Sequence, residues 1–170
     1  MEQPQLLQIQ LDAQDTVYTP PAVAADVVDF FKPSGRILEP CKGDGVFLKY
    51  LPSADWCEIQ EGKDFFAWTE PVDWLIGNPP YHQYTKWMRH SYSLANNIVY
   101  LIPLNKPFVS MARIRETFQW GKICHMRAYE NARKIGWDFG FPVGAVHFQK
   151  GYKGPMYSSI YQLPSESTDE

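Results

Sequence analysis

The stretch "RILEPCKGDGVFLKYL", residues 36–51, decides the predicted fold. It joins two apolar runs through a turn that contains Gly43 and Gly45. This order is typical of a short buried strand, a tight turn and a helix, the unit that opens a doubly wound α/β sheet. Ligands of such sheets bind at the carboxyl ends of the strands, so the turn is also a predicted binding element.

The segments around this unit alternate between strand and helix patterns, which favours an open, mainly parallel α/β sheet. Further buried strands are predicted at 54–60, 72–78, 96–103, 122–129 and 144–152. Helices are predicted at 19–31, 81–95 and 108–120. Thr19 is the expected N-cap of the first helix, with Pro20 and Pro21 in its first turn. The last helix is expected to place Met111, Ile114 and Phe118 on one face.

The length of 170 residues and the 45% of apolar residues fit one folded domain. We predict a loose arm at 1–17, the domain at 18–153 and a poorly ordered tail at 154–170. The three cysteines form no CxxC pair, so neither a disulfide framework nor a metal site is expected. No apolar run approaches the roughly 18 residues of a membrane helix. These features predict a cytoplasmic protein with reduced thiols and no membrane partner.

The net charge of −3 is unevenly distributed along the chain. Residues 1–81 sum to −8, residues 82–153 to +8 and the rest to −3. An acidic half beside a basic half suits a protein that holds a cationic ligand on one side and meets phosphates on another. Solvated helix faces are the alternative explanation.

Acidic side chains surround the glycine turn. Glu39 and Asp44 flank it, with Lys42 as the opposing charge, so a cationic or neutral nucleotide-like ligand fits better than ATP. Glu58 follows the second predicted strand, where doubly wound folds place an acid on ribose hydroxyls. Glycine used only for turn geometry and a surface carboxylate after the strand remain the alternatives.

The predicted strand at 72–78 breaks off into Asn78-Pro79-Pro80-Tyr81. The prolines rigidify the loop, and the Pro79 carbonyl has no Pro80 N–H beside it. The Asn78 side-chain oxygen and this carbonyl could therefore both accept hydrogen bonds from one NH2 group. Tyr81 would stack on the planar group that carries this amine. An ordinary turn is the alternative.

Four segments together resemble motifs of the S-adenosylmethionine-dependent amino methyltransferases, and among them the gamma-class adenine-N6 DNA methyltransferases of restriction-modification systems. They are "YTPPAVAADVVDFF" at 18–31, "ILEPCKGDGVFL" at 37–48, "DFFAW" at 64–68 and "LIGNPPY" at 75–81, in the family order. "AVHFQKG" weakly resembles the last family motif. The resemblance implies a Rossmann-like class I methyltransferase fold: a mainly parallel seven-stranded sheet with one antiparallel strand and helices on both faces. It also implies that residues 18–153 form the catalytic domain.

The resemblance also implies the cofactor, the reaction and the site. S-adenosylmethionine would donate a methyl group to the exocyclic N6 amine of adenine in DNA. The implied cofactor contacts are Tyr18, Thr19, Glu39, Cys41, Gly43, Gly45, Glu58, Ile59, Asp64 and Phe65. The implied catalytic residues are Asn78, Pro79, Pro80 and Tyr81. Tyr81 and Phe141 would form the base pocket, with Trp137 and Phe139 as alternatives to Phe141.

Two departures from the family pattern modify these expectations. Glu58 and Asp64 are so close in sequence that the usual helix between the second and third strands must be nearly absent. Ile59 and Phe65 are then the residues left to cover the cofactor, which predicts weak cofactor affinity. The residues after the last motif are too few for a target-recognition domain. We therefore expect a single-stranded or loosely specified substrate, a separate recognition subunit or a homodimer.

Nucleic acid is thus the expected partner, and the resemblance implies DNA. The expected phosphate contacts are Arg89, Arg113, Arg115, Lys122, Arg127, Arg133 and Lys134. RNA adenine-N6 methylation, protein glutamine-N5 methylation and a non-catalytic cofactor-binding subunit are the alternatives.

Overall fold

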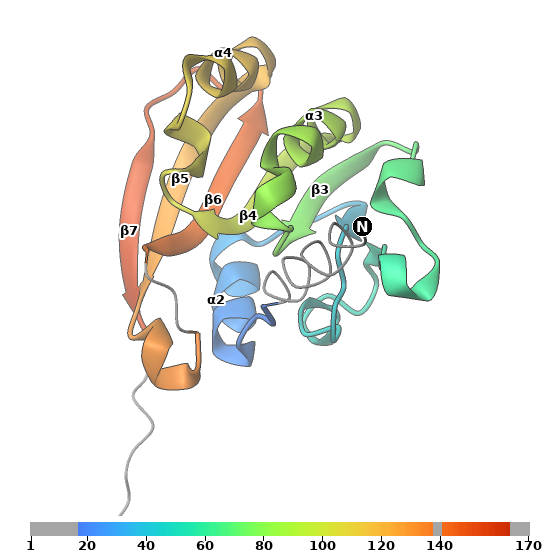
Figure 1. The fold of residues 1–170 in the computed structure, drawn as a ribbon, viewed down its shortest axis with the longest axis vertical. Coiled ribbons are helices and arrows are strands. Elements are labelled where there is room, and N and C mark those ends of the chain that lie inside the picture. Colours follow the sequence, from blue (N-terminus) through green and yellow to red (C-terminus); the bar gives the residue numbers. More distant parts are fainter. Residues whose placement is uncertain (1–16, 138–140, 164–170) are drawn as a thin grey trace, which may run out of the picture.

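The computed structural model describes residues 17–137 and 141–163. Seven strands of these residues form one sheet in the order β2-β1-β3-β4-β6-β5-β7 (Figure 1). β6 is antiparallel to both of its neighbours, and every other pairing is parallel. This confirms the predicted seven-stranded sheet with one antiparallel strand. The strands are β1 (Ile37–Glu39), β2 (Asp55–Trp56), β3 (Val72–Gly77), β4 (Ala95–Pro103), β5 (Gly121–Glu130), β6 (Val143–Lys150) and β7 (Tyr157–Gln162).

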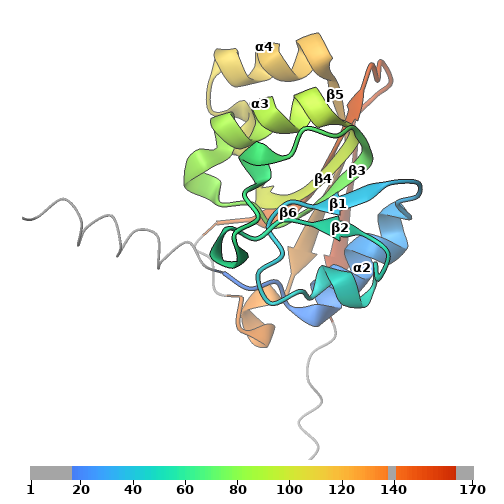
Figure 2. The ribbon, with the colours of Figure 1, turned by 90° about the vertical axis from the view of Figure 1, so that its right-hand side faces the viewer.

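Helices cover both faces of the sheet, as predicted. They are α2 (Pro21–Phe31), α3 (Tyr84–Leu94) and α4 (Met111–Trp120). Figure 2 shows α3 and α4 on one side of the sheet and α2 on the other. Within the described residues, six short 3-10 helices connect the elements: η1 (Phe47–Lys49), η2 (Ile59–Glu61), η3 (Phe65–Ala67), η4 (Tyr81–Gln83), η5 (Lys106–Phe108) and η6 (Ala132–Ile135).

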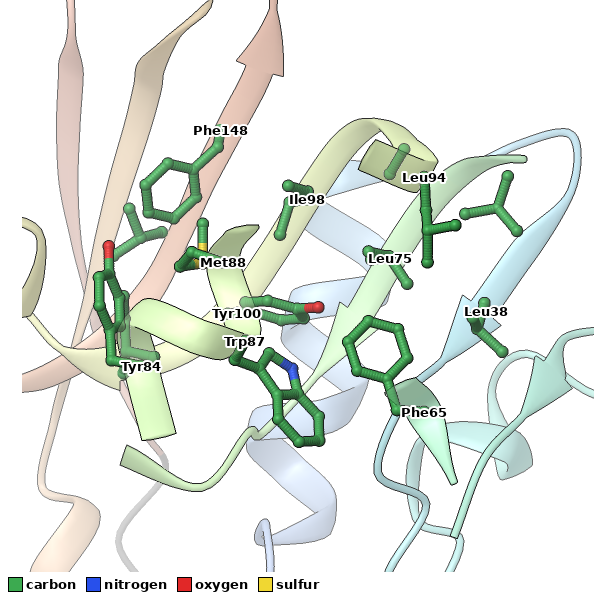
Figure 3. Close-up of a cluster of buried hydrophobic side chains, with 14 of the residues drawn as sticks. Leu38, Phe65, Leu75, Tyr84, Trp87, Met88, Leu94, Ile98, Tyr100 and Phe148 are labelled. Atoms are coloured by element: carbon green, nitrogen blue, oxygen red, sulfur yellow. The ribbon is translucent and has the colours of Figure 1, made fainter. Parts of the chain in front are cut away.

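Alternate residues of the central strands build two separate cores. Successive side chains of a strand point to opposite faces. Leu75 of β3 therefore packs with Trp87 and Met88 of α3, in the cluster drawn in Figure 3. The next residue, Ile76, packs on the other face with Val27 of α2. Burial on both faces explains why these strands read as nearly continuous apolar runs.

Three local expectations are wrong. The N-cap of α2 is Pro20 rather than Thr19, whose hydroxyl accepts a hydrogen bond from Asn78 instead. The helix expected after the glycine turn is only the single turn η1. Pro52 disfavours a helical Leu51, and the chain must enter β2 at Asp55, so a longer helix has no room. The third wrong expectation is that the tail at 154–170 is poorly ordered, because it contains a strand.

β7 lies inside the segment predicted as a poorly ordered tail from Gly154. It pairs in parallel with β5, and Tyr161 packs against the core on the α2 face. Leu163, immediately after the strand, is 1% exposed. These contacts explain the order of a segment whose composition is mostly polar.

Of the predicted arm at 1–17, only Val17 belongs to the described residues. No helix in 17–137 or 141–163 has the length and apolar character needed to cross a membrane.

Candidate active site

A pocket of about 210 Å³ lies at the carboxyl ends of β1 and β3. It brings together nine of the residues predicted for the site: Tyr18, Thr19, Glu39, Cys41, Gly43, Glu58, Ile59, Asn78 and Pro80. The remaining lining residues are Val17, Lys42, Asp44, Val46, Phe47 and Gln60. Segments up to 61 positions apart in the sequence therefore converge where an open α/β sheet binds its ligand.

Glu58 fixes the glycine turn. Its Oε2 accepts the Gly43 backbone N–H at 2.8 Å, and its Oε1 accepts the N–H of Gln60 at 3.1 Å. Gly43 and Gly45 have φ angles of 54° and 81°, the left-handed region that favours glycine. The carboxylate thus holds the β1 turn against the segment that follows β2, and both segments border the pocket.

Glu39, the last residue of β1, is a buried carboxyl at the pocket wall. It is 1% exposed, and its Oε2 has no hydrogen-bond partner among the described residues. Burial first, and then the neighbouring Asp44 carboxylate, raise its pKa to about 9. A cationic ligand group would give Oε2 a partner and favour the ionised form.

The Asn78 side chain has a fixed orientation. Its Nδ2 donates to the Val17 carbonyl at 3.0 Å and to Thr19 Oγ1 at 3.2 Å. Both amide hydrogens are used in this way, so Oδ1 is the group of this side chain that can accept a hydrogen from a ligand. The arrangement supplies an oriented acceptor beside the pocket.

Close backbone packing positions Asn78. A Cβ atom on Gly77 would lie 3.2 Å from Pro40 Cδ and 3.3 Å from Cys41 Sγ, so glycine lets the end of β3 approach the β1 turn. The Cys41 thiol thus lies against the end of β3, and burial raises its pKa.

The residues after Asn78 form a rigid exit from β3. Pro79 is buried, and Pro80 borders the pocket and caps η4. Tyr81 opens η4 and packs, half-buried, against the core that lies under α3.

The structure does not bring Asp64 and Phe65, two of the predicted cofactor contacts, to this pocket. The Asp64 side chain accepts the Phe66 N–H at 2.9 Å and lines a different hollow, beside Trp56. Phe65 is 2% exposed and packs against Trp87, with ring centroids 4.8 Å apart. Gly45 shapes the turn without lining the pocket. The residues between Glu58 and Asp64 form η2 alone, in agreement with the predicted near-absence of a helix there.

The predicted base-pocket residue Phe141 lies in another hollow, of about 360 Å³. This hollow lies at the end of β5 and the start of β6. The carboxyl end of β5 is at the same end of the sheet as the carboxyl ends of β1 and β3, where the pocket lies. Trp137 also lines it but is 2% exposed and packs in the core on the α2 face. Phe139 lies outside the described residues.

Sequence reasoning missed two contributions to the pocket. Val17 acts through its carbonyl oxygen, which no side-chain pattern can signal. Lys42 borders the pocket, forms an ion pair with Glu61 at 2.5 Å and lies 4.1 Å from the centroid of the Trp56 ring. Its place inside the glycine turn was the available signal.

Several of the expected phosphate contacts are engaged within the protein. Arg113 donates to Thr85 at 3.2 Å, and Lys122 donates to the Gly154 carbonyl at 3.0 Å. Arg127 is buried and paired with Asp26 at 2.7 Å, so its assignment as a phosphate contact is wrong. Arg89 forms a double hydrogen bond with Glu116. Arg115 and Lys134 are exposed.

No protein-family model and no curated protein matches this sequence. Solved structures do match its fold. A candidate class I S-adenosylmethionine-dependent methyltransferase from Listeria monocytogenes superposes with a TM-score of 0.65 at 13% identity, over 97% of this chain and 73% of that one. The modification subunit of a candidate type I restriction enzyme from Vibrio vulnificus gives 0.58 at 13%, over 95% and 51%. A dimethyladenosine transferase from Plasmodium falciparum gives 0.57 at 14%, over 79% and 63%.

These matches establish the fold, which is the Rossmann-like fold of class I methyltransferases. The chain spans about half the length of the Vibrio protein.

Proposed function

We propose that this protein is an S-adenosylmethionine-dependent methyltransferase that methylates the exocyclic N6 amine of adenine in DNA. The orientation of Asn78 carries the proposal. Its amide hydrogens are held by Val17 and Thr19, which leaves an acceptor oxygen at the edge of a pocket with three carboxyl groups. The match to methyltransferase folds supports the same reaction class.

The pocket fits the proposed cofactor in charge and hydrogen bonding. Glu39, buried with an unpartnered oxygen, suits the cationic methionine end, and Glu58 suits the ribose hydroxyls. Thr19, the Cys41 backbone and Gly43 would complete the contacts. When bound, S-adenosylmethionine supplies an electrophilic methyl group on a sulfonium sulfur.

Asn78 and Pro79 are proposed to act on the target amine. Asn78 Oδ1 and the Pro79 carbonyl accept its two hydrogens, which orients the nitrogen lone pair and stabilises the positive charge that develops on nitrogen. Tyr81 is proposed to stack on the base. Acceptors held in advance lower the barrier because they need no rearrangement during the reaction.

DNA is the proposed substrate because the target group is an amine on a planar ring and residues 82–153 carry a net charge of +8. Exposed Lys134, which lines the hollow at the end of β5, is available as a phosphate contact. A cytoplasmic location is part of the proposal, and all three cysteines are unbridged thiols.

Mass spectrometry of nucleosides tests the proposal directly. The purified protein and S-adenosylmethionine are incubated separately with single-stranded DNA, duplex DNA and RNA. The expected product is N6-methyladenine in DNA. Methylation of RNA alone would move the substrate class to RNA, and absence from all three would contradict nucleic-acid methylation.

Two variants control this experiment. Asn78→Ala should abolish turnover while calorimetry still detects cofactor binding, because Asn78 is proposed to contact the amine. Tyr50→Ser, an exposed aromatic position outside the pocket, should leave turnover unchanged.

A further inference from the structure

α4 packs against the protein with its polar side. Three contacts join it to α3: Arg113 to Thr85 at 3.2 Å, Thr117 to Tyr92 at 2.9 Å and Glu116 to Arg89 at 2.6 Å. Thr117 is the buried residue of this helix. An amphipathic helix normally turns its apolar stripe toward the core, so this orientation is reversed along α4 as far as Phe118. Trp120, at the end of the helix, does pack against Tyr92 and the core.

Two large apolar residues of α4 consequently face outward. Met111 and Phe118 are 60% and 59% exposed. Phe108 of η5 and Met156, which precedes β7, are 44% and 50% exposed. Phe108, Phe118 and Met156 border a hollow of about 250 Å³, which we call the α4 groove. Ile114, Lys122 and Ile123 also line it.

The lining of the α4 groove suits the side chains of a protein segment. Small-molecule pockets typically include several converging polar groups. The lining of the α4 groove is almost wholly apolar. An exposed apolar patch of this kind marks an interaction site more often than a ligand pocket.

The charges around the α4 groove are basic. Lys122 lines it, and a second hollow that shares Phe118 and Lys122 adds Lys153. Arg115 is exposed on α4. The single acid of this helix, Glu116, is already bound by Arg89. A symmetric dimer through this face would oppose like charges, which is unfavourable.

We propose that the α4 groove docks a partner protein through an amphipathic helix that carries apolar anchors flanked by Asp or Glu. The anchors enter between Phe118, Ile114 and Met156, and the acids meet Lys122, Lys153 and Arg115. This recognition follows the helix-in-groove mode. It does not depend on the proposed methyl transfer.

The α4 groove and the candidate active site lie at opposite ends of the strands. Lys122 and Ile123 are at the start of β5, whereas the pocket is at the carboxyl ends of β1 and β3, which run parallel to β5. Figure 1 shows α4 at the end away from the arrowhead of β3. A partner on α4 therefore leaves the pocket open.

Fluorescence anisotropy with two synthetic helical peptides, each about 18 residues long, tests the proposal on the full chain. Both peptides carry leucines at i, i+3, i+4 and i+7; one has flanking glutamates and the other has lysines instead. The acidic peptide should bind at least about tenfold more tightly, and Phe118→Ser and Arg115→Gln should each weaken it severalfold. The matched controls Tyr50→Ser and Lys49→Gln, on exposed residues elsewhere, should leave binding unchanged.

Several outcomes would overturn the proposal. An acidic helix is excluded as the occupant of the α4 groove if the acidic peptide does not saturate binding up to about 100 μM, or if both peptides bind equally. A dimer in sedimentation analysis that dissociates with Phe118→Ser makes a second copy the occupant. A large gain in peptide affinity with Leu7→Ser and Leu11→Ser makes the chain's own first segment the occupant.

Discussion

Thr19 Oγ1 accepts a hydrogen bond from Asn78 Nδ2 at 3.2 Å, and this contact ties the segment before α2 to the end of β3. The two residues are 59 positions apart in the sequence. With the Val17 carbonyl as the second acceptor, Thr19 decides which way the Asn78 amide faces. A residue expected to start a helix therefore orients the proposed catalytic acceptor.

Replacing Thr19 by Val should lower kcat about tenfold or less, with a smaller change in KM. Val has a similar shape but offers no acceptor, so one Asn78 hydrogen loses a bond worth about 1 kcal/mol, and the amide is less firmly held. Steady-state kinetics measures the effect. Thr19→Ser retains the hydroxyl and should stay within about twofold of the wild type, and an equal loss in both variants would contradict the orienting role.

Glu39→Gln should become more stable relative to the wild type as the pH rises. The folded-state pKa of Glu39 is raised to about 9, whereas the unfolded carboxyl titrates near 4.5. The folded state therefore holds the extra proton between these values, and wild-type stability falls as pH rises through that window, by at most about 1.4 kcal/mol per pH unit. Gln removes this dependence. Denaturant unfolding at about pH 5.5 and about pH 8 checks the difference, and parallel profiles would count against it.

The isolated chain should bind S-adenosylmethionine weakly, with a Kd above about 1 μM. Asp64 and Phe65 lie away from the pocket, and the cover beside Glu58 is Ile59, which is 68% exposed. An open site buries less of a ligand, so less apolar area is removed from water. Isothermal titration calorimetry measures this affinity, and a nanomolar Kd would refute the prediction. Ile59→Phe, which enlarges the cover, should tighten binding.

The sequence predicted most of the sheet because β3 and β4 are buried on both faces and read as apolar runs that end at the polar residues Asn78 and Asn105. It did not reveal β7, whose Tyr157 and Ile160 are exposed and whose pairing with β5 is distant in sequence. Local propensity carries little information about such long-range pairing.

The sequence predicted which side chains at strand ends form the candidate site. It did not predict placements that depend on the path of the backbone between elements. Glu39, Glu58 and Asn78 meet in one pocket because they end or follow neighbouring strands. Phe65 does not reach it, because the short segment after Glu58 forms only η2 before η3, and the ring packs on Trp87 of α3. Motif order therefore indicates which residues are candidates, while the length of each connection decides their placement.

Arg127→Met should destabilise the fold by about 3 kcal/mol without changing the salt dependence of nucleic-acid binding. Arg127 and Asp26 are 11% and 10% exposed at their side chains, and Tyr129 also donates to Asp26, so removing the cation leaves a buried carboxylate without its counter-ion. Denaturant unfolding measures the loss, and adding Asp26→Leu should recover part of it. By contrast, exposed Lys134→Gln should keep stability and lower the salt slope of DNA binding by about one. A lower slope for Arg127→Met at unchanged stability would instead make Arg127 a phosphate contact.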